Sequence, residues 1–204
     1  MKGTINMSNY AGKTNINVQE ITIIPITDED EGTYGTALDL TGRARSASYT
    51  PNVKETKLYG DGEVQEKVID ATEGTLTLAL NYLTDSDRQT LFGETAQNGS
   101  NVVTGSEQPK QCVVIFKSLC KKDGSVANLY KFFCVTFKPN EETIQQIEDG
   151  VTYSTVQITG DYRVNKHNKA LMATRRHVDT TATGASTIVT SWFSTAEYTG
   201  PTTP

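Results

Sequence analysis

The sequence contains few of the residues from which catalytic and metal sites are built. It has two histidines, His167 and His177, and neither has a cysteine or aspartate partner at the spacing of zinc ligands. A serine or cysteine nucleophile needs a base that a third group holds in place, and two histidines offer few choices. Neither a G-x-S-x-G motif nor a phosphate-binding loop occurs. We therefore expect a protein that is not an enzyme and that holds no metal or cofactor.

Cysteine is also scarce. The three cysteines, Cys112, Cys120 and Cys134, are an odd number and so cannot all pair. Their neighbours in the sequence are apolar: Val113-Val114, Leu119 and Phe132-Phe133. We interpret them as reduced thiols that act as small hydrophobic residues in strands.

Long apolar runs and excess positive charge are missing as well. No run approaches the roughly 20 apolar residues that a membrane-spanning helix needs. The first residues lack the apolar segment of a signal peptide, which predicts synthesis in the cytoplasm. The net charge of −5 and the pI near 5.1 argue against tight nucleic-acid binding, which requires a basic surface. They do not exclude a surface that nucleic acid passes without sticking.

One acidic run, DEDEG at 28–32, superficially resembles a calcium-binding loop. It lacks the later glutamate of an EF-hand and its flanking helices. We interpret it as a solvated acidic loop.

The most informative segment is 56–93. Two β-rich stretches flank Gly60-Asp61-Gly62, a tight turn of the kind that joins antiparallel strands. Residues 73–80 then alternate, with three leucines on one face. Thr84 is an expected helix N-cap, acidic residues occupy the first turn, and Gly93 closes a short helix. This segment predicts architecture and no catalytic centre.

Other strands are expected where β-branched and apolar residues gather: 19–26, 43–49, 111–119, 129–137 and 151–164. Pro51 is expected to stop the second of these. The runs 111–119 and 129–137 are almost continuously apolar, which predicts strands covered on both faces. Segments 94–109 and 139–150 are polar and predict surface loops.

The end of the chain differs from the rest in composition. Residues 180–186 have the composition of a linker, and the aromatic residues Trp192, Phe193 and Tyr198 follow in a polar tail. We expect one domain at 1–178 and a C-terminal arm at 179–204. These aromatic side chains dock either on the same chain or on a neighbour, and a neighbour is favoured because aromatic anchors are enriched where proteins meet.

The order of these motifs resembles the major tail proteins, or tail tube proteins, of long-tailed phages with noncontractile tails that infect Gram-positive hosts. The resemblance spans about 33–164 and rests on the order and spacing of several short motifs. These are TYGT at 33–36, LTG at 40–42, LYGDG at 58–62, GTLTL at 74–78, DRQTLFG at 87–93, VVIFK at 113–117, YKFFC at 130–134 and a strand at 155–160. Residues 165–177 match only loosely.

The resemblance implies a mainly β fold, an antiparallel β-sandwich with one short flanking α-helix and extended loops and terminal arms. In that family six subunits form a ring and contribute strands to a continuous inner β-barrel. Rings stack into a tube around a tape measure protein, bounded by tail terminator and distal tail proteins, and genomic DNA passes through the lumen without specific binding. The implied location is the virion tail, with no membrane partner.

A tube of this kind predicts roles for individual residues. Four carboxylates on polar strand faces are candidates for facing the lumen, where they would repel phosphates: Glu55, Glu63, Glu73 and Asp161. Each is equally compatible with an outer-surface, solubilising position. Candidates for contacts between subunits are Tyr34, Trp192, Phe193 and Tyr198. Ring stacking is expected to use 1–18, 28–36, 94–109 and the tail beyond 178.

An alternative function stays open. An immunoglobulin-like β-sandwich displayed on a surface, with Trp192 and tyrosines forming a sugar platform, would also be built from antiparallel strands. Oligomeric behaviour separates the two, because a tube subunit forms rings or tubes and a carbohydrate-binding module does not.

Overall fold

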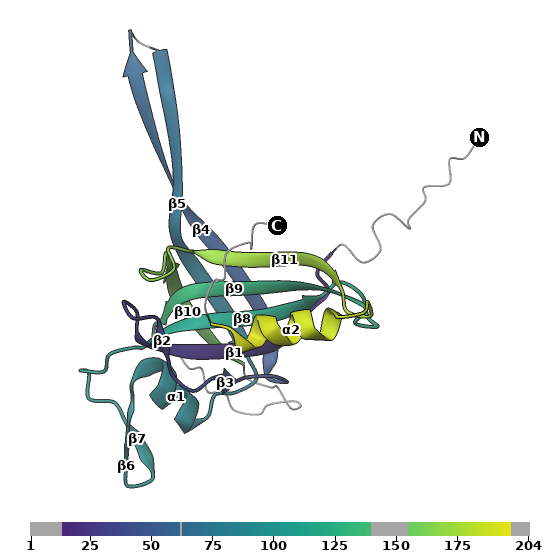
Figure 1. Ribbon diagram of the computed structural model, residues 1–204. Coiled ribbons are helices and arrows are strands. Elements are labelled where there is room, and N and C mark those ends of the chain that lie inside the picture. Colours follow the sequence, from purple (N-terminus) through teal and green to yellow (C-terminus); the bar gives the residue numbers. More distant parts are fainter. Residues whose placement is uncertain (1–13, 62, 140–154, 197–204) are drawn as a thin grey trace, which may run out of the picture.

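The computed structural model describes residues 14–61, 63–139 and 155–196, and these fold mainly into antiparallel β-strands (Figure 1). The strands are β1 (Asn17–Asp28), β2 (Thr33–Tyr34), β3 (Leu38–Asp39), β4 (Ala44–Gly60), β5 (Glu63–Leu80), β6 (Thr95–Gln97), β7 (Ser100–Val102), β8 (Gln111–Leu119), β9 (Val126–Phe137), β10 (Val156–Arg163) and β11 (Met172–Asp179). The helices are α1 (Asp85–Phe92) and α2 (Ala185–Ser194). The predicted fold class is therefore confirmed: mainly β, antiparallel, with a short helix beside the sheet.

Nine strands belong to one sheet, in the order β2-β1-β8-β9-β10-β5-β4. Two strands lie off this path, because β3 pairs with β1 and β11 pairs with β9. β9 carries β11 along its first part and β10 near its end, so the sheet divides there. A separate small hairpin joins β6 and β7.

The sheet bends over a single large core. Side chains of β1, β8 and β9 on one side and of β5 and β10 on the other belong to the same buried cluster. Two facing layers thus arise from one continuous sheet. Leu76, Leu78 and Leu80 are fully buried in this core, as their alternation predicted. Phe132 and Tyr162 meet in it with ring centroids 5.0 Å apart.

The strands β8 and β9 are covered on both faces, as their apolar sequences predicted. Their inner side chains line the main core, while Val113 and Ile115 of β8 point to the opposite face. There they form a second cluster with Ile24 and Ala196. The helix α2 lies across this outer face (Figure 1).

The helix α1 has the ends that the sequence predicted. The Thr84 hydroxyl accepts a hydrogen bond from the amide of Asp87, and the Asp87 carboxylate accepts one from the amide of Thr84. This reciprocal pair is a capping box. Gly93 ends the helix at φ 76°, in the left-handed region. Leu91 and Phe92 anchor the helix in the main core.

The prediction that Pro51 stops a strand is wrong. β4 runs through Pro51, which pairs with Gly74 of β5, so two expected strands are one strand of 17 residues. β4 lies at the end of the sheet order and pairs only with β5. Such an edge strand tolerates a proline because one side of its backbone has no strand partner to lose.

Other boundaries also differ from expectation. The expected loop at 94–109 contains the β6–β7 hairpin, and the loosely matching region 165–177 contains most of β11. The tail contains α2, where the sequence indicated only a linker and aromatic residues. The loop predicted at 139–150 lies outside the described residues except for Pro139. No helix in the described part of the chain has the length and hydropathy to cross a bilayer.

Candidate functional site

The outer parts of β4 and β5 form a two-stranded ribbon that projects from the body (Figure 1). We call residues 52–72 the arm; it is a different segment from the C-terminal arm predicted at 179–204. β10 pairs with β5 only from Glu73 to Leu80, so beyond this point the two arm strands pair with each other alone. Every side chain that the structure describes in the arm is exposed. The predicted hairpin is found at the tip of this ribbon, where Gly60 pairs with Glu63; Gly62 of the predicted turn lies outside the described residues.

The arm carries most of the exposed large apolar side chains. In the described part of the chain eight such side chains are exposed, and five of them belong to the arm. These are Val53, Leu58, Tyr59, Val68 and Ile69, with exposed fractions from 52% to 62%. Scattered exposed apolar residues are normal in a monomer, but a contiguous group on one element marks a contact surface.

The strand register divides the arm into two faces, because directly paired residues point to the same side of a ribbon. One face carries the pairs Glu55–Ile69 and Lys57–Lys67. The Glu55 carboxylate lies 2.8 Å from Lys67 Nζ and 3.0 Å from Lys57 Nζ. These ammonium groups, Lys67 foremost, lower the pKa of Glu55. We call this the ionic face.

The other face carries the pairs Thr56–Val68 and Leu58–Glu66, and we call it the apolar face. Nearer the base the same face carries the charged pair Lys54–Asp70, where Lys54 is bonded to Glu73. Leu58 is 56% exposed and Val68 is 52% exposed. The Glu66 side chain makes no ion pair or hydrogen bond within the described chain. This face therefore offers two aliphatic side chains and one carboxylate that no cation neutralises.

The base of the arm holds two of the four predicted carboxylates. Glu73 and Asp161 line an open groove of about 640 Å³ between β4, β5 and β10. Lys54 Nζ lies 2.7 Å from the Glu73 carboxylate, and this contact is the main cause that lowers the pKa of Glu73. Lys138 Nζ lies 2.7 Å from the Asp161 carboxylate. The carboxylates here are paired with lysines, so the groove surface is mixed in charge.

The structure thus brings Glu73 and Asp161 together and places the other two candidates on the arm. Glu55 belongs to the ionic face, and Glu63 lies next to the tip at the start of β5. All four lie on the projecting arm or at its base. Whether they face a lumen stays a prediction.

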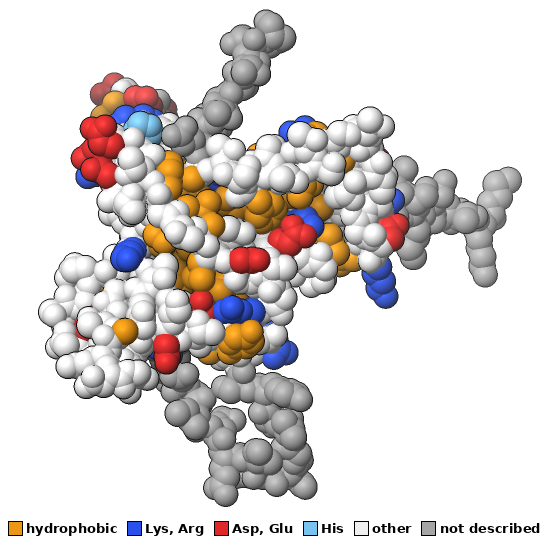
Figure 2. All heavy atoms as spheres, turned by 60° about the horizontal axis from the view of Figure 1, so that its bottom comes forward, with side chains coloured by type: hydrophobic (Ala, Val, Ile, Leu, Met, Phe, Trp, Pro, Cys, Tyr) orange, Lys and Arg blue, Asp and Glu red, His pale blue; other side chains and the backbone are white. Residues whose placement is uncertain are grey.

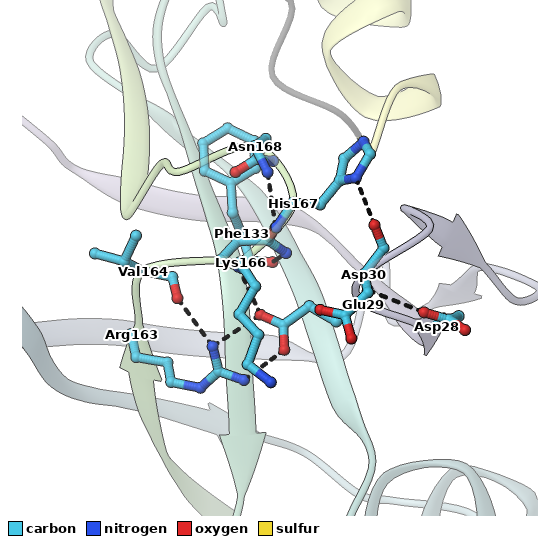
Figure 3. Close-up of polar contacts among 10 residues, drawn as sticks. Asp28, Glu29, Asp30, Phe133, Arg163, Val164, Lys166, His167 and Asn168 are labelled. Atoms are coloured by element: carbon cyan, nitrogen blue, oxygen red, sulfur yellow. Dashed lines mark hydrogen bonds and ion pairs between the residues drawn. The ribbon is translucent and has the colours of Figure 1, made fainter.

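A half-buried ion pair ties the turn after β1 to the end of β10 (Figure 3). Arg163 donates from Nη1 and Nη2 to the two oxygens of Glu29, at 2.8 and 2.6 Å. The backbone amide of Lys166 donates to the same carboxylate at 2.8 Å. The Glu29 side chain is only 8% exposed. The Arg163 guanidinium, followed by the Lys166 amide, holds the pKa of Glu29 below its usual value.

A second contact holds the same turn from the other side. His167 Nδ1 lies 3.0 Å from the carbonyl oxygen of Asp30 (Figure 3). The His167 ring also packs against Gly32. A Cβ at Gly32 would come within 2.7 Å of this ring, and its φ of 65° also favours glycine. Asn165, 1% exposed, shapes the opposing loop by accepting from the amides of His167 and Asn168.

This cluster is a structural clamp between two loops. It has a paired carboxylate and guanidinium, and the Cys134 thiol lies beside Glu29 with a pKa that burial, foremost, raises to about 11, so this thiol stays protonated. Within the described residues no group of three or more His, Cys, Asp or Glu side chains is arranged to hold a metal ion. The interpretation of 28–32 as a solvated loop is wrong for Glu29, which is buried by its pairing with Arg163.

The predicted contact residues of the tail dock on their own chain where the structure describes them. Trp192 and Phe193 of α2 pack, half-buried, against the cluster of Ile24, Val113 and Ile115. Tyr34 of β2 packs against the same cluster. Trp192 and Phe193 thus contact their own chain, and a contact with a neighbour stays a prediction. Tyr198 lies outside the described residues.

Beneath α2 lies a buried lysine that the sequence did not single out. Lys131 of β9 is 4% exposed, donates from Nζ to the carbonyl oxygen of Thr195, and lies 5.1 Å from the centre of the Trp192 ring. Burial lowers the pKa of Lys131 to about 8. The Trp192 ring thus covers a cation of its own chain, which leaves less of it for a ligand.

The cysteines have the environment that the sequence predicted. All three are unpaired and buried. Burial raises the pKa of Cys112 to about 12 and that of Cys134 to about 11. Thiols that stay protonated are poor nucleophiles, so these behave as apolar packing residues.

Apolar side chains also reach the surface of the body. Figure 2 views the end that carries α1 and shows such side chains along the middle of that face, with acidic and basic side chains scattered among them. Sequence reasoning missed the importance of Leu58, Val68 and Ile69, which it interpreted only as strand residues. No described segment covers these side chains, and this becomes visible only once the length of the arm is known.

No protein-family model matches this chain, and no curated protein matches it at a significant level.

Proposed function

We propose that this chain is a structural subunit that assembles with copies of itself, as the tail tube subunit of a long-tailed phage. The observation that carries the proposal is the arm, a long ribbon with exposed apolar side chains that no element of the described chain covers. The tube itself, with its hexameric rings, tape measure protein and passage of genomic DNA, comes from the resemblance of motifs spanning about 33–164.

The arm supports self-assembly on energetic grounds. A two-stranded ribbon is at best marginally stable in water unless a third strand or another surface packs on it. Burying a leucine or valine side chain contributes about 1.5–3 kcal/mol. Five exposed apolar side chains on such a ribbon favour a partner that covers them. A copy of the same chain is the partner present at the highest concentration during assembly.

The free edges of the sheet support the same conclusion. In the described chain β4 pairs only with β5, and β11 pairs only with β9, so each has an edge without a strand partner. Unpaired edges are templates for pairing with another chain, and closing a sheet into a barrel removes them. Subunits joined at these edges would form the inner barrel that the resemblance implies.

The charge balance fits a conduit for DNA. A net charge of −5 and carboxylates along the arm offer few cations to release counterions from phosphates. The arm carries five acidic residues and three lysines, and the two lysines of its ionic face, Lys57 and Lys67, are both paired with Glu55. This ionic face is the surface we assign to the lumen. DNA would pass such a wall without being held.

The test compares the intact chain with a variant in which residues 53–71 are replaced by a two-residue Asn-Gly turn. This deletion leaves the buried leucines of β5 in place, so the body should keep its fold. We expect the intact protein to form rings or tubes in negative-stain electron micrographs and the shortened variant to stay monomeric. A variant with Tyr82→Ser, an exposed residue outside both the arm and the segments expected to stack, should assemble normally.

Two results would contradict the proposal. One is tube formation by the shortened variant. The other is an intact protein that stays monomeric up to about 1 mM, where a contact worth only about 4 kcal/mol would already associate. A monomer that instead retains affinity for a glycan would support the carbohydrate-binding alternative.

A further inference from the structure

The apolar face of the arm has a counterpart elsewhere on the molecule. A hollow of about 340 Å³ opens where the beginning of β1 approaches the beginning of β4. Its lining includes the aromatic rings of Tyr49, Phe116 and Tyr130 together with Val18. These side chains belong to the main core or pack against it. At the hollow the core therefore reaches the surface.

The aromatic lining is held in place by its own contacts. The rings of Phe116 and Tyr130 stack with centroids 4.9 Å apart, and Tyr49 lies 6.2 Å from Tyr130. The Tyr130 hydroxyl accepts a hydrogen bond from Asn15 Nδ2 at 3.0 Å. Phe116 and Tyr130 are only 4% and 3% exposed, so they form the floor of the hollow, and Tyr49 is half-buried beside them. Asparagine and serine side chains complete the lining. A preformed hollow with an aromatic floor and a polar rim suits an aliphatic side chain of a partner that also carries a polar group.

Unpaired backbone borders the hollow on both sides. β1 pairs with β8 from Asn17 onward, but its other edge first gains a strand partner at Thr22, in β3. β4 has no partner opposite β5 in the described chain. A second hollow of about 370 Å³ continues along β1 from Asn17 to Glu20. The region therefore combines apolar pockets with free strand edges, as surfaces that receive an extended segment do.

The rim of the hollow carries a positive charge, opposite in sign to that of Glu66 on the apolar face of the arm. Arg45 lines the hollow, is exposed, and has no ion-pair or hydrogen-bond partner among the described residues. On the arm, the unpaired carboxylate of Glu66 lies directly opposite Leu58. One surface thus offers two aliphatic side chains and an anion, and the other an aromatic hollow and a cation.

We propose that the apolar face of the arm of one copy docks into the hollow of a second copy, with Leu58 and Val68 entering it and Glu66 pairing with Arg45. The contact cannot form within one chain, because Tyr49 of the hollow and Leu58 of the arm belong to the same straight strand and lie roughly 30 Å apart along it. Arm and hollow are different surfaces, so the contact is head-to-tail and generates a closed ring or an open filament.

This inference rests on the proposed function and names the partner surface of the arm. It also leaves the ionic face, with Glu55, free to line a lumen. The two faces of one ribbon would then have separate tasks, one toward the neighbour and one toward the channel.

A charge exchange tests the pairing in the full chain. The protein concentration at which half of the chains are assembled is measured for wild type, Arg45→Glu, Glu66→Arg and the double variant, by light scattering with electron microscopy. We expect each single change to raise this concentration about ten-fold or more, since like charges now meet across the contact. The double variant should return to within about three-fold of wild type. Lys122→Glu, the same charge change at an exposed turn, is the matched control.

Mixing gives an independent readout of direction. The variant Leu58→Ser/Val68→Ser has a weakened arm and an intact hollow, whereas Ala47→Arg obstructs the hollow and keeps an intact arm. Each alone should stay monomeric. Their mixture should form a 1:1 dimer and nothing larger, because one arm and one hollow remain functional. Mass photometry distinguishes this species from rings.

The outcomes separate this inference from the proposed function. If the arm variant loses assembly while Arg45→Glu and Ala47→Arg assemble like wild type, the arm binds elsewhere and the inference is overturned, although self-assembly stands. Loss of assembly in both single charge variants without recovery in the double variant also overturns the pairing. A wild-type chain that never assembles removes both.

Discussion

At the scale of single residues, the ion pair of Glu29 and Arg163 stands out because the sequence places its partners 134 residues apart. It joins the turn after β1 to the end of β10, two segments that no strand pairing connects in the described chain. The Glu29 side chain is 8% exposed and that of Arg163 is 37% exposed. Loss of the Glu29 charge therefore leaves a partly solvated guanidinium without its counter-ion, which costs more than at an exposed pair and less than at a fully buried one.

We predict that Glu29→Gln lowers the free energy of unfolding by about 2 kcal/mol at pH 7. The folded-state pKa of Glu29 lies below its unfolded value, so its contribution is present above the usual carboxyl range and is lost as the pH falls through the folded pKa. Wild type and variant should therefore converge in acid. Urea unfolding at several pH values measures this, with the exposed Glu31→Gln as control. A constant difference down to low pH would contradict the assignment.

Lys131 predicts the opposite pH trend. Its pKa falls from the usual 10.5 to about 8 on folding, so below pH 8 it is charged in both states and buried at a cost. Between these values the unfolded chain binds more protons, and stability rises with pH. We predict that Lys131→Met raises the unfolding free energy at pH 7 by about 1–3 kcal/mol and removes that rise. Denaturation at pH 7 and pH 9.5 checks it, with Lys122→Met for comparison. A less stable variant at pH 7 would show that the contacts of Lys131 with Trp192 and Thr195 dominate.

At the scale of elements, α2 is a helix with little to hold it except its packing. Gly184 at its N-cap offers no side-chain hydrogen bond, and neither end carries a charge that complements the helix dipole. Ala185 is its one buried residue. Its half-buried residues Ile188, Val189, Trp192 and Phe193 follow the spacing of a single helix face. Its stability therefore depends on the sheet beneath it.

We predict that Trp192→Ala releases α2 while the sheet stays folded. Amide hydrogen exchange should accelerate at least ten-fold across 185–194, and the amides of β8 and β9 should keep their protection. Ser191→Ala, on the exposed side of the helix, is the matched control. Unchanged exchange in the Trp192 variant would mean that the other contacts of α2 suffice.

Local patterns predicted the elements that depend on local chemistry. Thr84, Asp87 and Gly93 specify the ends of α1 without help from the rest of the chain, and the leucines of β5 identify its buried face. The continuity of β4 through Pro51 was not predictable from the residue itself, because it depends on the strand being at the edge of the sheet.

The site was less predictable for a related reason. Glu29 looks like any solvated acid until a distant arginine is placed beside it, and His167 meets Gly32 only after two loops converge. Leu58 and Val68 look like ordinary strand residues, and their exposure follows from β10 pairing only with the inner half of β5. Each of these features is a tertiary relationship that no window of sequence contains.

At the scale of the whole molecule, the structure divides into a body with a continuous core and an arm without one. The core side chains end near Gly74, where a Cβ would come within 2.4 Å of the Tyr162 hydroxyl. Beyond it the described side chains of both strands are exposed. The core of the body therefore supplies the stability, and the arm, which adds no core, is the part that we propose for assembly.

We predict that the arm amides, residues 53–71, exchange rapidly in the dilute monomer and become protected on assembly. The ribbon has hydrogen bonds between its own strands only, so it opens at little free-energy cost until a partner covers it. Hydrogen exchange with mass spectrometry at low and high protein concentration measures both states, with β9 as the internal reference. Arm amides that are equally protected at both concentrations would argue against a role for the arm in assembly.

The continuity of β5 has a mechanical consequence. One end of this 18-residue strand is bonded to β10 inside the core, and its other end is the arm. No loop separates the two, so the arm is fixed to the body at one end and free at the other. A pull on its tip along the strand direction loads the β5–β10 hydrogen bonds in parallel, in shear, instead of opening them one at a time. Subunits linked through such arms would transmit tension from one folded core to the next and would stretch little before a core yields.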